Sequence, residues 1–266
     1  MEKLSRREQE FIQTAAQFLE HPGFMIQLAN AFGKPLDLLQ KTLPQNVQEK
    51  IASLVEKSLK KTLEISISTL PKAEDPSLPR QPLLQARHHT FAAAALGAIG
   101  GFFGPGTIAI ELPITTGIMF RSIANTAQSF GEDLQDSHVR LECLQIFAMG
   151  SPQSKADDAM KSAYFSQRLA FYSFITKASE KGAATLLARF ITRVASEYQI
   201  VVAEKILAET LPILGAAGGA VINSSFTHYF NQTAYYHFGL RYLERKYGLE
   251  SVQQVYFEAF KNFRSK

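Results

Sequence analysis

Apolar side chains recur along this chain at the spacing of one helix face. Phe11 opens the first series at i, i+4, i+7 and i+8, and a His-Pro-Gly sequence at 21–23 ends it. Ile51 opens a second series of the same kind, with lysines on the other sides of the helix. A period near 3.6 residues is typical of amphipathic helices. The pattern therefore predicts an all-α protein built as a multi-helix bundle.

Turn and capping residues divide the rest of the pattern into separate helices. The helices expected after the first 82 residues span 83–101, 107–130, 139–149, 156–178, 183–207, 210–226, 227–247 and 251–263. Asp136 is a suitable N-cap, and Gly131 and Gly248 mark breaks. Four prolines between residues 70 and 83 are typical of an extended linker. We therefore expect an N-terminal helical arm at 1–70, a proline-rich linker at 71–83 and a helical body at 84–266.

Two stretches of the chain are nearly uncharged. Residues 88–120 contain one formal charge, Glu111, and residues 210–240 contain none, although charged residues make up 20% of the chain. Ten of the 16 glycines also lie in these stretches. Small residues let two helix backbones approach closely. We therefore expect a central glycine-rich, nearly uncharged helical hairpin that packs against a second glycine-rich helix.

Neither stretch has the form of an ordinary transmembrane helix, which needs about 20 apolar residues without a break. A Gly-Pro-Gly turn at 104–106 interrupts the first stretch, and asparagines, serines and histidines interrupt the second. Three arrangements remain open: a buried helix pair in a soluble protein, a hairpin inserted into lipid, and a double span. The expected membrane or partner contacts in the hairpin are Phe91, Gly97, Gly100, Gly101, Phe102, Phe103, Gly104 and Pro105.

Composition excludes several classes of protein. A net charge of +4 is too small for a dedicated nucleic-acid binder, so no nucleic-acid partner is expected. Cys143 is the only cysteine, which excludes an intramolecular disulfide and a multi-cysteine metal site, and its apolar neighbours favour an inert thiol. The first 19 residues carry mixed charges and no apolar run of the kind that a secretory signal needs. A cytoplasmic location is therefore expected.

Glu111 is conspicuous as the single charge of its stretch. It precedes Pro113 near the expected start of a helix, where the helix dipole favours a solvent-exposed carboxylate. The same residue could instead be buried and paired with a cation, or could act as a functional acid with a raised pKa. All three interpretations remain open from the sequence.

Polar residues in the second half of the chain form two stripes at helical spacing. One stripe runs from Asn223 to Asn231 in steps of four residues. In the other, His237, Arg241 and Glu244 follow at i, i+4 and i+7, where Arg241 is placed to bond Glu244. A structural hydrogen-bond network is the favoured use of these side chains.

The residues that could carry chemistry follow from these patterns. The candidate catalytic residues are Glu111, His237, Arg241 and Glu244, and the candidate members of the polar network are Glu132, Asn223 and His228. A metal site assembled across helices from Glu111, Glu142, His228 or His237 is the alternative. The chain contains no HExxH motif and no paired ExxH motif, so neither a metal nor a cofactor is expected.

Two long strings resemble the EcsC family of bacterial proteins. ELPITTGIMFRSIANTAQSFGEDL with RLECLQIFAMG lies within 111–150, and LPILGAAGGAVINSSFTHYFNQTAYYHFGLRYLERKYG spans 211–248. The resemblance covers roughly residues 84–258 and implies a mostly helical, cytoplasmic body. Because the family is named for a protein encoded beside the subunits of an ABC transporter, it also implies an association with the membrane or a transporter. It implies no catalytic residue.

Three functional hypotheses follow. The first is a non-enzymatic accessory protein that docks on the inner face of the cytoplasmic membrane, or on a membrane protein there such as an ABC transporter. In that hypothesis the hairpin makes the contact and basic residues of the arm attract anionic lipid. These basic residues are Lys50, Lys57, Lys60 and Lys61. The second is a hydrolase or metal-dependent enzyme that uses Glu111 with His237 or His228 in a buried polar cavity. The third is a packing module that self-associates.

Overall fold

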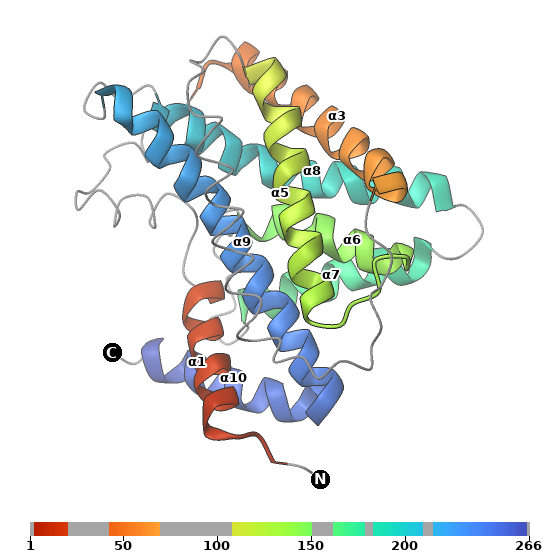
Figure 1. Ribbon diagram of the computed structural model, residues 1–266, viewed down its shortest axis with the longest axis vertical. Helices are drawn as coiled ribbons and strands as arrows, with labels where there is room; N and C mark the ends of the chain where they lie inside the picture. The colour runs from red at the N-terminus through yellow and green to blue at the C-terminus, as the bar shows by residue number, and fades with distance from the viewer. Residues whose placement is uncertain are drawn as a thin grey trace.

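The computed structural model describes residues 3–20, 43–69, 108–150, 162–178, 183–209 and 215–264. These residues form α-helices and one short 3-10 helix, with no strand among them, which confirms the all-α prediction (Figure 1). In chain order the elements are α1 (Arg6–Glu20), α3 (Gln45–Thr69), α5 (Ile108–Ser129), α6 (Ser137–Gln145), η4 (Ile146–Gly150), α7 (Ala163–Ala178), α8 (Ala183–Glu209), α9 (Gly215–Tyr247) and α10 (Leu249–Arg264).

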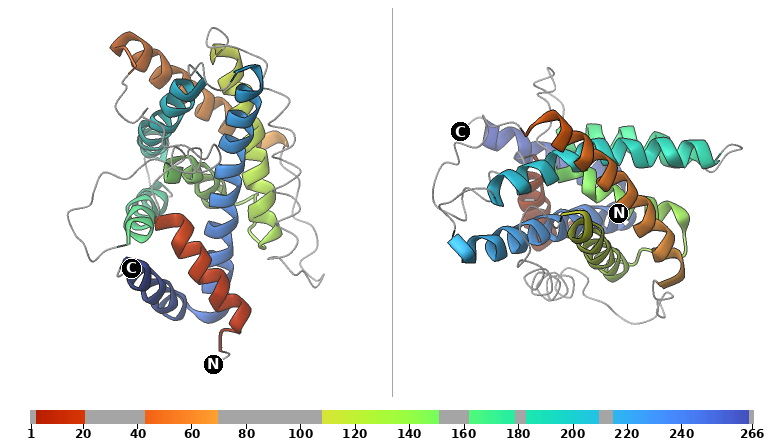
Figure 2. Two further views of the ribbon diagram at one scale, coloured as in Figure 1. Left: turned by 90° about the vertical axis from the view of Figure 1, so that its left-hand side faces the viewer. Right: turned by 90° about the horizontal axis from the view of Figure 1, so that it is seen from above.

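The long helix α9 lies at the centre of the bundle. It packs against α1, α5, α8, α10 and η4, so most of the other elements touch it (Figures 1 and 2). The predicted break between 226 and 227 is wrong, because α9 continues unbroken from Gly215 to Tyr247. No proline interrupts these residues, and Asn223, Thr227 and Asn231, on both sides of the predicted break, lie on one buried face of the helix. No described helix is both long and apolar enough to cross a membrane.

The first half of the predicted hairpin, including Phe91 and the other expected contacts from Gly97 to Pro105, lies outside the described residues. Its second half is α5, which packs against α9 and α3. The predicted linker at 71–83 also lies outside them. The two helices of the predicted arm, α1 and α3, pack against body helices and share one buried core with them.

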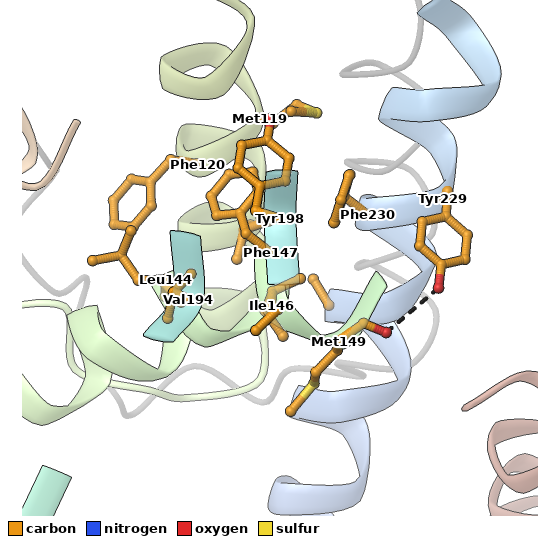
Figure 3. Close-up of a cluster of buried hydrophobic side chains, with 14 of the residues drawn as sticks. Met119, Phe120, Leu144, Ile146, Phe147, Met149, Val194, Tyr198, Tyr229 and Phe230 are labelled. Carbon is orange, nitrogen blue, oxygen red and sulfur yellow. Dashed lines mark hydrogen bonds between the residues drawn. The ribbon is translucent and has the colours of Figure 1, made fainter. Parts of the chain in front are cut away.

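The core joins α5, η4, α8 and α9 through large aromatic side chains (Figure 3). Phe147 of η4 lies 4.7 Å from Tyr198 of α8 and 5.3 Å from Phe230 of α9, measured between ring centroids. Aromatic side chains each bury roughly 150–250 Å² and so dominate the energetics of such a core. This packing fixes α9 relative to the elements that carry the polar side chains described below.

The first and last described helices, α1 and α10, pack together at one end of the bundle. At the start of α1, Glu8 accepts hydrogen bonds of 3.0 and 2.9 Å from the hydroxyl of Tyr247. At its end, Glu20 accepts a bond of 2.9 Å from the Tyr256 hydroxyl and another of 2.9 Å from the amide of Ala163, in the first turn of α7. One carboxylate therefore caps α7 and holds α10.

Gly239 of α9 lies directly against the ring of Phe11 on α1. A Cβ at this position would lie 2.8 Å from Cε1 of Phe11 and closer still to its Cζ. Phe11 cannot retreat freely, because its ring packs 5.4 Å from that of Tyr235 and 5.7 Å from that of Tyr236. Gly239→Ala is therefore expected to lower the free energy of unfolding by about 1–2 kcal/mol, even after the gain in helix propensity.

Gly117 of α5 provides the matched control for this prediction, because no heavy atom lies within 4 Å of the Cβ that it would gain. Gly117→Ala should raise the free energy of unfolding by up to about 1 kcal/mol through helix propensity alone. Urea denaturation of both variants measures the two effects. A change of the same sign in both would contradict the close approach at Gly239.

Candidate functional site

A cluster of charged side chains, most of them buried or partly buried, joins α6, α7, α9 and the turn before α6. We call it the ion network. It contains three carboxylates and three guanidinium groups: Glu132, Glu142, Glu244, Arg168, Arg241 and Arg245. Their formal charges balance. Buried charges are tolerated only when they are paired in this way.

Arg241 lies at the middle of the ion network. Its Nε and Nη2 donate to the two carboxylate oxygens of Glu132 at 2.7 and 3.2 Å, and its Nη1 donates to Glu142 at 3.0 Å. Arg245, one turn later on α9, donates to Glu132 as well and to the carbonyl oxygen of Phe130 at 2.6 Å. One face of α9 thus binds both α6 and the turn that follows α5.

Glu244 pairs with Arg168 of α7, not with Arg241 as the stripe on α9 suggested. The Arg168–Glu244 pair is bidentate, with two N–O distances of 2.6 Å. The predicted bond between Arg241 and Glu244 is wrong, because Arg241 bonds Glu132 in the turn before α6 and Glu142 on α6, and Glu244 bonds Arg168 on α7. Planar two-bond pairing of this kind is the strong form of a carboxylate–guanidinium contact.

His237 extends the ion network into a row of three buried side chains. The hydroxyl of Tyr164 lies 3.1 Å from Nδ1 of His237, and Nε2 of His237 lies 3.3 Å from Oε2 of Glu142. The second contact is close enough for an ion pair, but it is not aligned as a hydrogen bond. Tyr164 and His237 are buried, and neither of the grooves described below reaches them.

The electrostatics of this row favour a neutral imidazole beside a charged carboxylate. Burial lowers the pKa of His237, and the neighbouring Glu142 only partly opposes that effect. Burial alone would raise the pKa of Glu142, but His237, Arg241 and Arg168 together hold it at about 2. Burial raises the pKa of the Tyr164 hydroxyl, so this group is not activated as a nucleophile. The arrangement is best suited to clamping three helices together.

Local sequence places the two acidic members of the ion network. Gly131 has a φ of +82°, a left-handed conformation that glycine adopts at little cost, and it turns the chain so that Glu132 faces α9. Asp136 then caps α6, as predicted, by accepting a bond of 2.8 Å from the amide of His138. Glu142 follows on the buried side of this short helix.

Glu111 is a buried ion-pair residue. Its Oε1 lies 2.6 Å from Nζ of Lys205 on α8, and the two side chains are only 8% and 9% exposed. Of the three interpretations of Glu111, the solvent-exposed carboxylate at a helix start is therefore wrong, although the residue does lie in the first turn of α5. Lys205 of α8 covers the Glu111 side of this turn and itself lies 5.6 Å from the ring centroid of Phe226 on α9.

The structure does not bring Glu111 and His237 together. Phe226, which marks the level of the Glu111–Lys205 pair on α9, precedes His237 by 11 residues, or about 16 Å of helix. His228 is half-buried and, because of burial, has a lowered pKa. It is not a member of the ion network. Glu111 and His237 therefore belong to two separate polar clusters.

Asn223 also lies away from the ion network. It precedes Arg241 by 18 residues, about 27 Å along α9. With Thr227 and Asn231 it forms the predicted stripe, which is buried, and each of the three keeps at least one side-chain atom without a hydrogen-bond partner. Of the predicted network members, Glu132 alone is part of the ion network.

The described residues include no group of three or more potential metal ligands. The thiol of Cys143 is fully buried, and burial together with Glu132 and Glu142 raises its pKa well above the ordinary value. A thiol in this state is a packed side chain without nucleophilic reactivity, as the sequence indicated.

Comparison with known protein families matches residues 7–243 to the EcsC protein family. The chain belongs to the EcsC family. The match begins within α1, so the family sequence extends closer to the N-terminus than the resemblance at 84–258. Comparisons with curated proteins and with solved structures give no match.

Several members of this EcsC protein's polar clusters were not predicted. The sequence offers no local signal for Tyr164, Arg168 or Arg245, because their partners lie elsewhere in the chain. Lys205 did carry a signal, since it and Glu204 are the two charged residues between Val201 and Ala208 in an apolar part of α8. A lysine on the buried face of such a helix is expected to pair with a carboxylate.

The ion network predicts a marked acid sensitivity of this EcsC protein. The pKa of Glu142 is depressed to about 2 from an ordinary value of 4.5, and that of Glu132 is also lowered, by Arg241 and Arg245 against the effect of burial. A depressed carboxyl pKa contributes stability that is complete above the unfolded-state value and is lost as the pH falls through the folded-state value. The free energy of unfolding should therefore decrease from about pH 5 downward.

Denaturant titrations of the wild type and of Glu142→Gln between neutral and acidic pH measure this contribution. Glu142→Gln should have a lower free energy of unfolding than the wild type at pH 7. Over the full pH range, acidification should lower the free energy of unfolding of the wild type by roughly 3 kcal/mol more than that of the variant. Parallel pH curves for the two proteins would contradict the assignment.

Proposed function

We propose that this EcsC-family protein is a non-enzymatic accessory factor that docks on the anionic, inner face of the cytoplasmic membrane. The observation that carries the proposal is an exposed apolar surface on α5 bordered by basic residues of α3 and α5. We call it the docking face. It consists of Ile65, Ile110, Ile114, Ile118, Lys61 and Arg121.

The apolar part of the docking face follows α5 in steps of one turn. Ile110, Ile114 and Ile118 are 69%, 58% and 38% exposed, and Ile65 of α3 beside them is 49% exposed. Between the two helices lies a groove of about 330 Å³ that includes Gly117, above which the space is open. Exposed isoleucines at neighbouring positions are unusual on a surface that faces only water. They are suited to shallow burial among lipid headgroups.

The charges around the docking face complement an anionic surface. Lys61 and Arg121 line the groove itself. Lys50 and Lys57, which precede Lys61 on α3 by 11 and 4 residues, lie on the same side of the helix and are exposed. Lys60 is engaged with Glu56 at 2.6 Å. At about 1 kcal/mol for each basic side chain near the membrane, these groups support weak, salt-sensitive attachment.

The contacts predicted at 91–105 lie outside the described residues and stay a prediction. They belong to the same nearly uncharged stretch as the first half of α5. The docking face therefore places the proposed membrane contact in that stretch as well, on residues that the structure describes. An ABC transporter as the partner likewise stays a proposal drawn from the resemblance.

Flotation with lipid vesicles tests the proposal. The wild type should float with vesicles that contain phosphatidylglycerol at about 0.05 M salt, and should largely dissociate at about 0.5 M salt, where the Debye length is a few ångströms. It should not float with pure phosphatidylcholine. Ile110→Ser/Ile114→Ser and Lys57→Gln/Lys61→Gln should each abolish most of the flotation.

The chain offers a matched control on α7. Leu169 and Tyr172 are 69% and 56% exposed, nearly the same as the two isoleucines, but α7 lies on the opposite side of the bundle from α5 (Figure 2). Leu169→Ser/Tyr172→Ser should float like the wild type. Equal loss in both double variants would contradict a specific docking face. If the protein floats only with vesicles that contain native membrane proteins, its partner is a protein and not the lipid itself. If the wild type is a dimer and Ile110→Ser/Ile114→Ser is a monomer, the docking face serves self-association.

A further inference from the structure

A second groove, of about 410 Å³, lies between the N-terminal half of α3 and the C-terminal half of α8. Its walls are largely apolar and include Ile51 of α3 with Ile200 and Leu207 of α8. The size and the apolar walls are typical of small-molecule sites, which add a few polar groups that orient the ligand. This groove is separate from the docking face, which α3 forms with α5.

Glu204 of α8 lines this groove without an electrostatic partner. Its Oε2 is buried and accepts no hydrogen bond, although the side chain as a whole is only half-buried. Burial raises the pKa of Glu204 to about 7. A carboxyl group that is desolvated, unpaired and placed in an apolar groove is costly to retain, and such groups are concentrated at functional sites.

The charged side chains that line the groove, among the described residues, are both carboxylates. From α3, Glu49 lines the groove and accepts a bond of 3.1 Å from Gln45. From α9, Tyr229 is close enough for the Glu204 charge to add to the effect of burial in raising the pKa of its hydroxyl. The next residue on α8, Lys205, is bonded to Glu111. No lysine or arginine is among the described residues that line the groove.

We infer that this groove binds a cationic amphiphile, a ligand with a primary ammonium head and an aliphatic tail. The ammonium donates to the carboxylate of Glu204, and the tail lies along Ile51, Ile200 and Leu207. The contact is made by Oε1 of Glu204, since Oε2 is the buried oxygen of the carboxylate. A ligand with a neutral head would leave the charge of Glu204 unpaired. A ligand with an anionic head would be repelled by the carboxylates of Glu204 and Glu49.

Binding should depend on pH in a defined direction. At pH 6 Glu204 is largely protonated and must lose its proton before it pairs with an ammonium, whereas at pH 8 it is already charged. The affinity for the amine should therefore rise about tenfold between these values and then level off. The affinity for an uncharged amphiphile of the same length should change little.

Calorimetric titration with n-octylamine and with n-octanol tests the inference, because the two probes share a tail and differ in the head. At pH 8 the wild type should bind the amine at least about tenfold more tightly than the alcohol. Glu204→Gln, which keeps the shape of the side chain, should remove this preference and the pH dependence while binding n-octanol within about twofold of the wild type. Glu49→Gln, the same change at an exposed carboxylate of the groove, should leave the preference for the amine intact.

Equal affinities of the wild type for the two probes would overturn the inference. So would n-octylamine binding that Glu204→Gln leaves unchanged, since that result would place the amine elsewhere. Thermal unfolding establishes that each variant is folded before titration. The titration tests the groove between α3 and α8, and its variants leave the docking face unchanged. A negative result in the titration is therefore independent of the result of the vesicle flotation.

Discussion

Arg241→Ala should lower the free energy of unfolding by about 3–5 kcal/mol at neutral pH. The substitution leaves Glu132 with Arg245 and leaves Glu142 beside a neutral His237, although both carboxylate side chains are only 6% exposed. A buried charge that loses its partner keeps the cost of desolvation without the compensating attraction. Urea denaturation measures the loss.

Arg6→Ala is the matched control, since Arg6 also pairs with a glutamate, at 3.0 Å, but its side chain is 92% exposed. We expect a change below about 0.5 kcal/mol, because exposed ion pairs contribute little. Adding Glu142→Gln to Arg241→Ala should restore part of the lost stability, since it removes one uncompensated charge. A loss no larger than that of Arg6→Ala would show that the ion network does not stabilise the fold.

Removal of either charge of the Glu111–Lys205 pair should lower the free energy of unfolding nearly as much as Arg241→Ala does. Removal of both charges should lower it much less. Glu111→Gln and Lys205→Met each leave one charge behind at a contact less than 10% exposed, and each should lower the free energy of unfolding by about 3–5 kcal/mol. The double variant leaves no charge, and buried ion pairs replaced by apolar or neutral side chains are often neutral in stability. A double-mutant cycle therefore measures a large coupling energy.

Glu56 and Lys60 supply the control cycle on α3. Their charged atoms are also 2.6 Å apart, but the side chains are 37% and 47% exposed. The same two substitutions there should couple by about 0.5 kcal/mol or less. Additive effects at Glu111 and Lys205 would contradict a structural pair, and intact stability in Glu111→Gln would return Glu111 to the candidates for a functional acid.

The helices could be predicted because their causes are local. The apolar period places Phe11 and Ile51 on buried or partly buried faces, Asp136 caps α6 through its own side chain, and Gly131 and Gly248 adopt the positive φ that ends α5 and α9. Each of these features depends on a few neighbouring residues. The unbroken course of α9 was not predicted, although the stripe from Asn223 to Asn231 crosses the predicted break at helical spacing.

The pairing of charges could not be predicted in the same way. His237, Arg241 and Glu244 were identified as one stripe, but their partners Glu142, Glu132 and Arg168 lie between 76 and 109 residues away in the chain. Which carboxylate meets which guanidinium depends on helix register and crossing angle, which no local pattern encodes. Glu204 illustrates the converse, because its lack of a partner is visible only once α3 and α8 are in place.

The joining of α1 to α10 constrains how this chain folds during synthesis. Glu8 and Glu20 find their tyrosine partners 239 and 236 residues later. At typical rates of translation, those partners follow on the order of 10–50 s after α1 has been made. During that interval the buried face of α1, with Ile12, Ala15 and Ala16, lacks the helix that it packs against most extensively, α10. The N-terminal helix is therefore made first but is among the last to complete its native contacts.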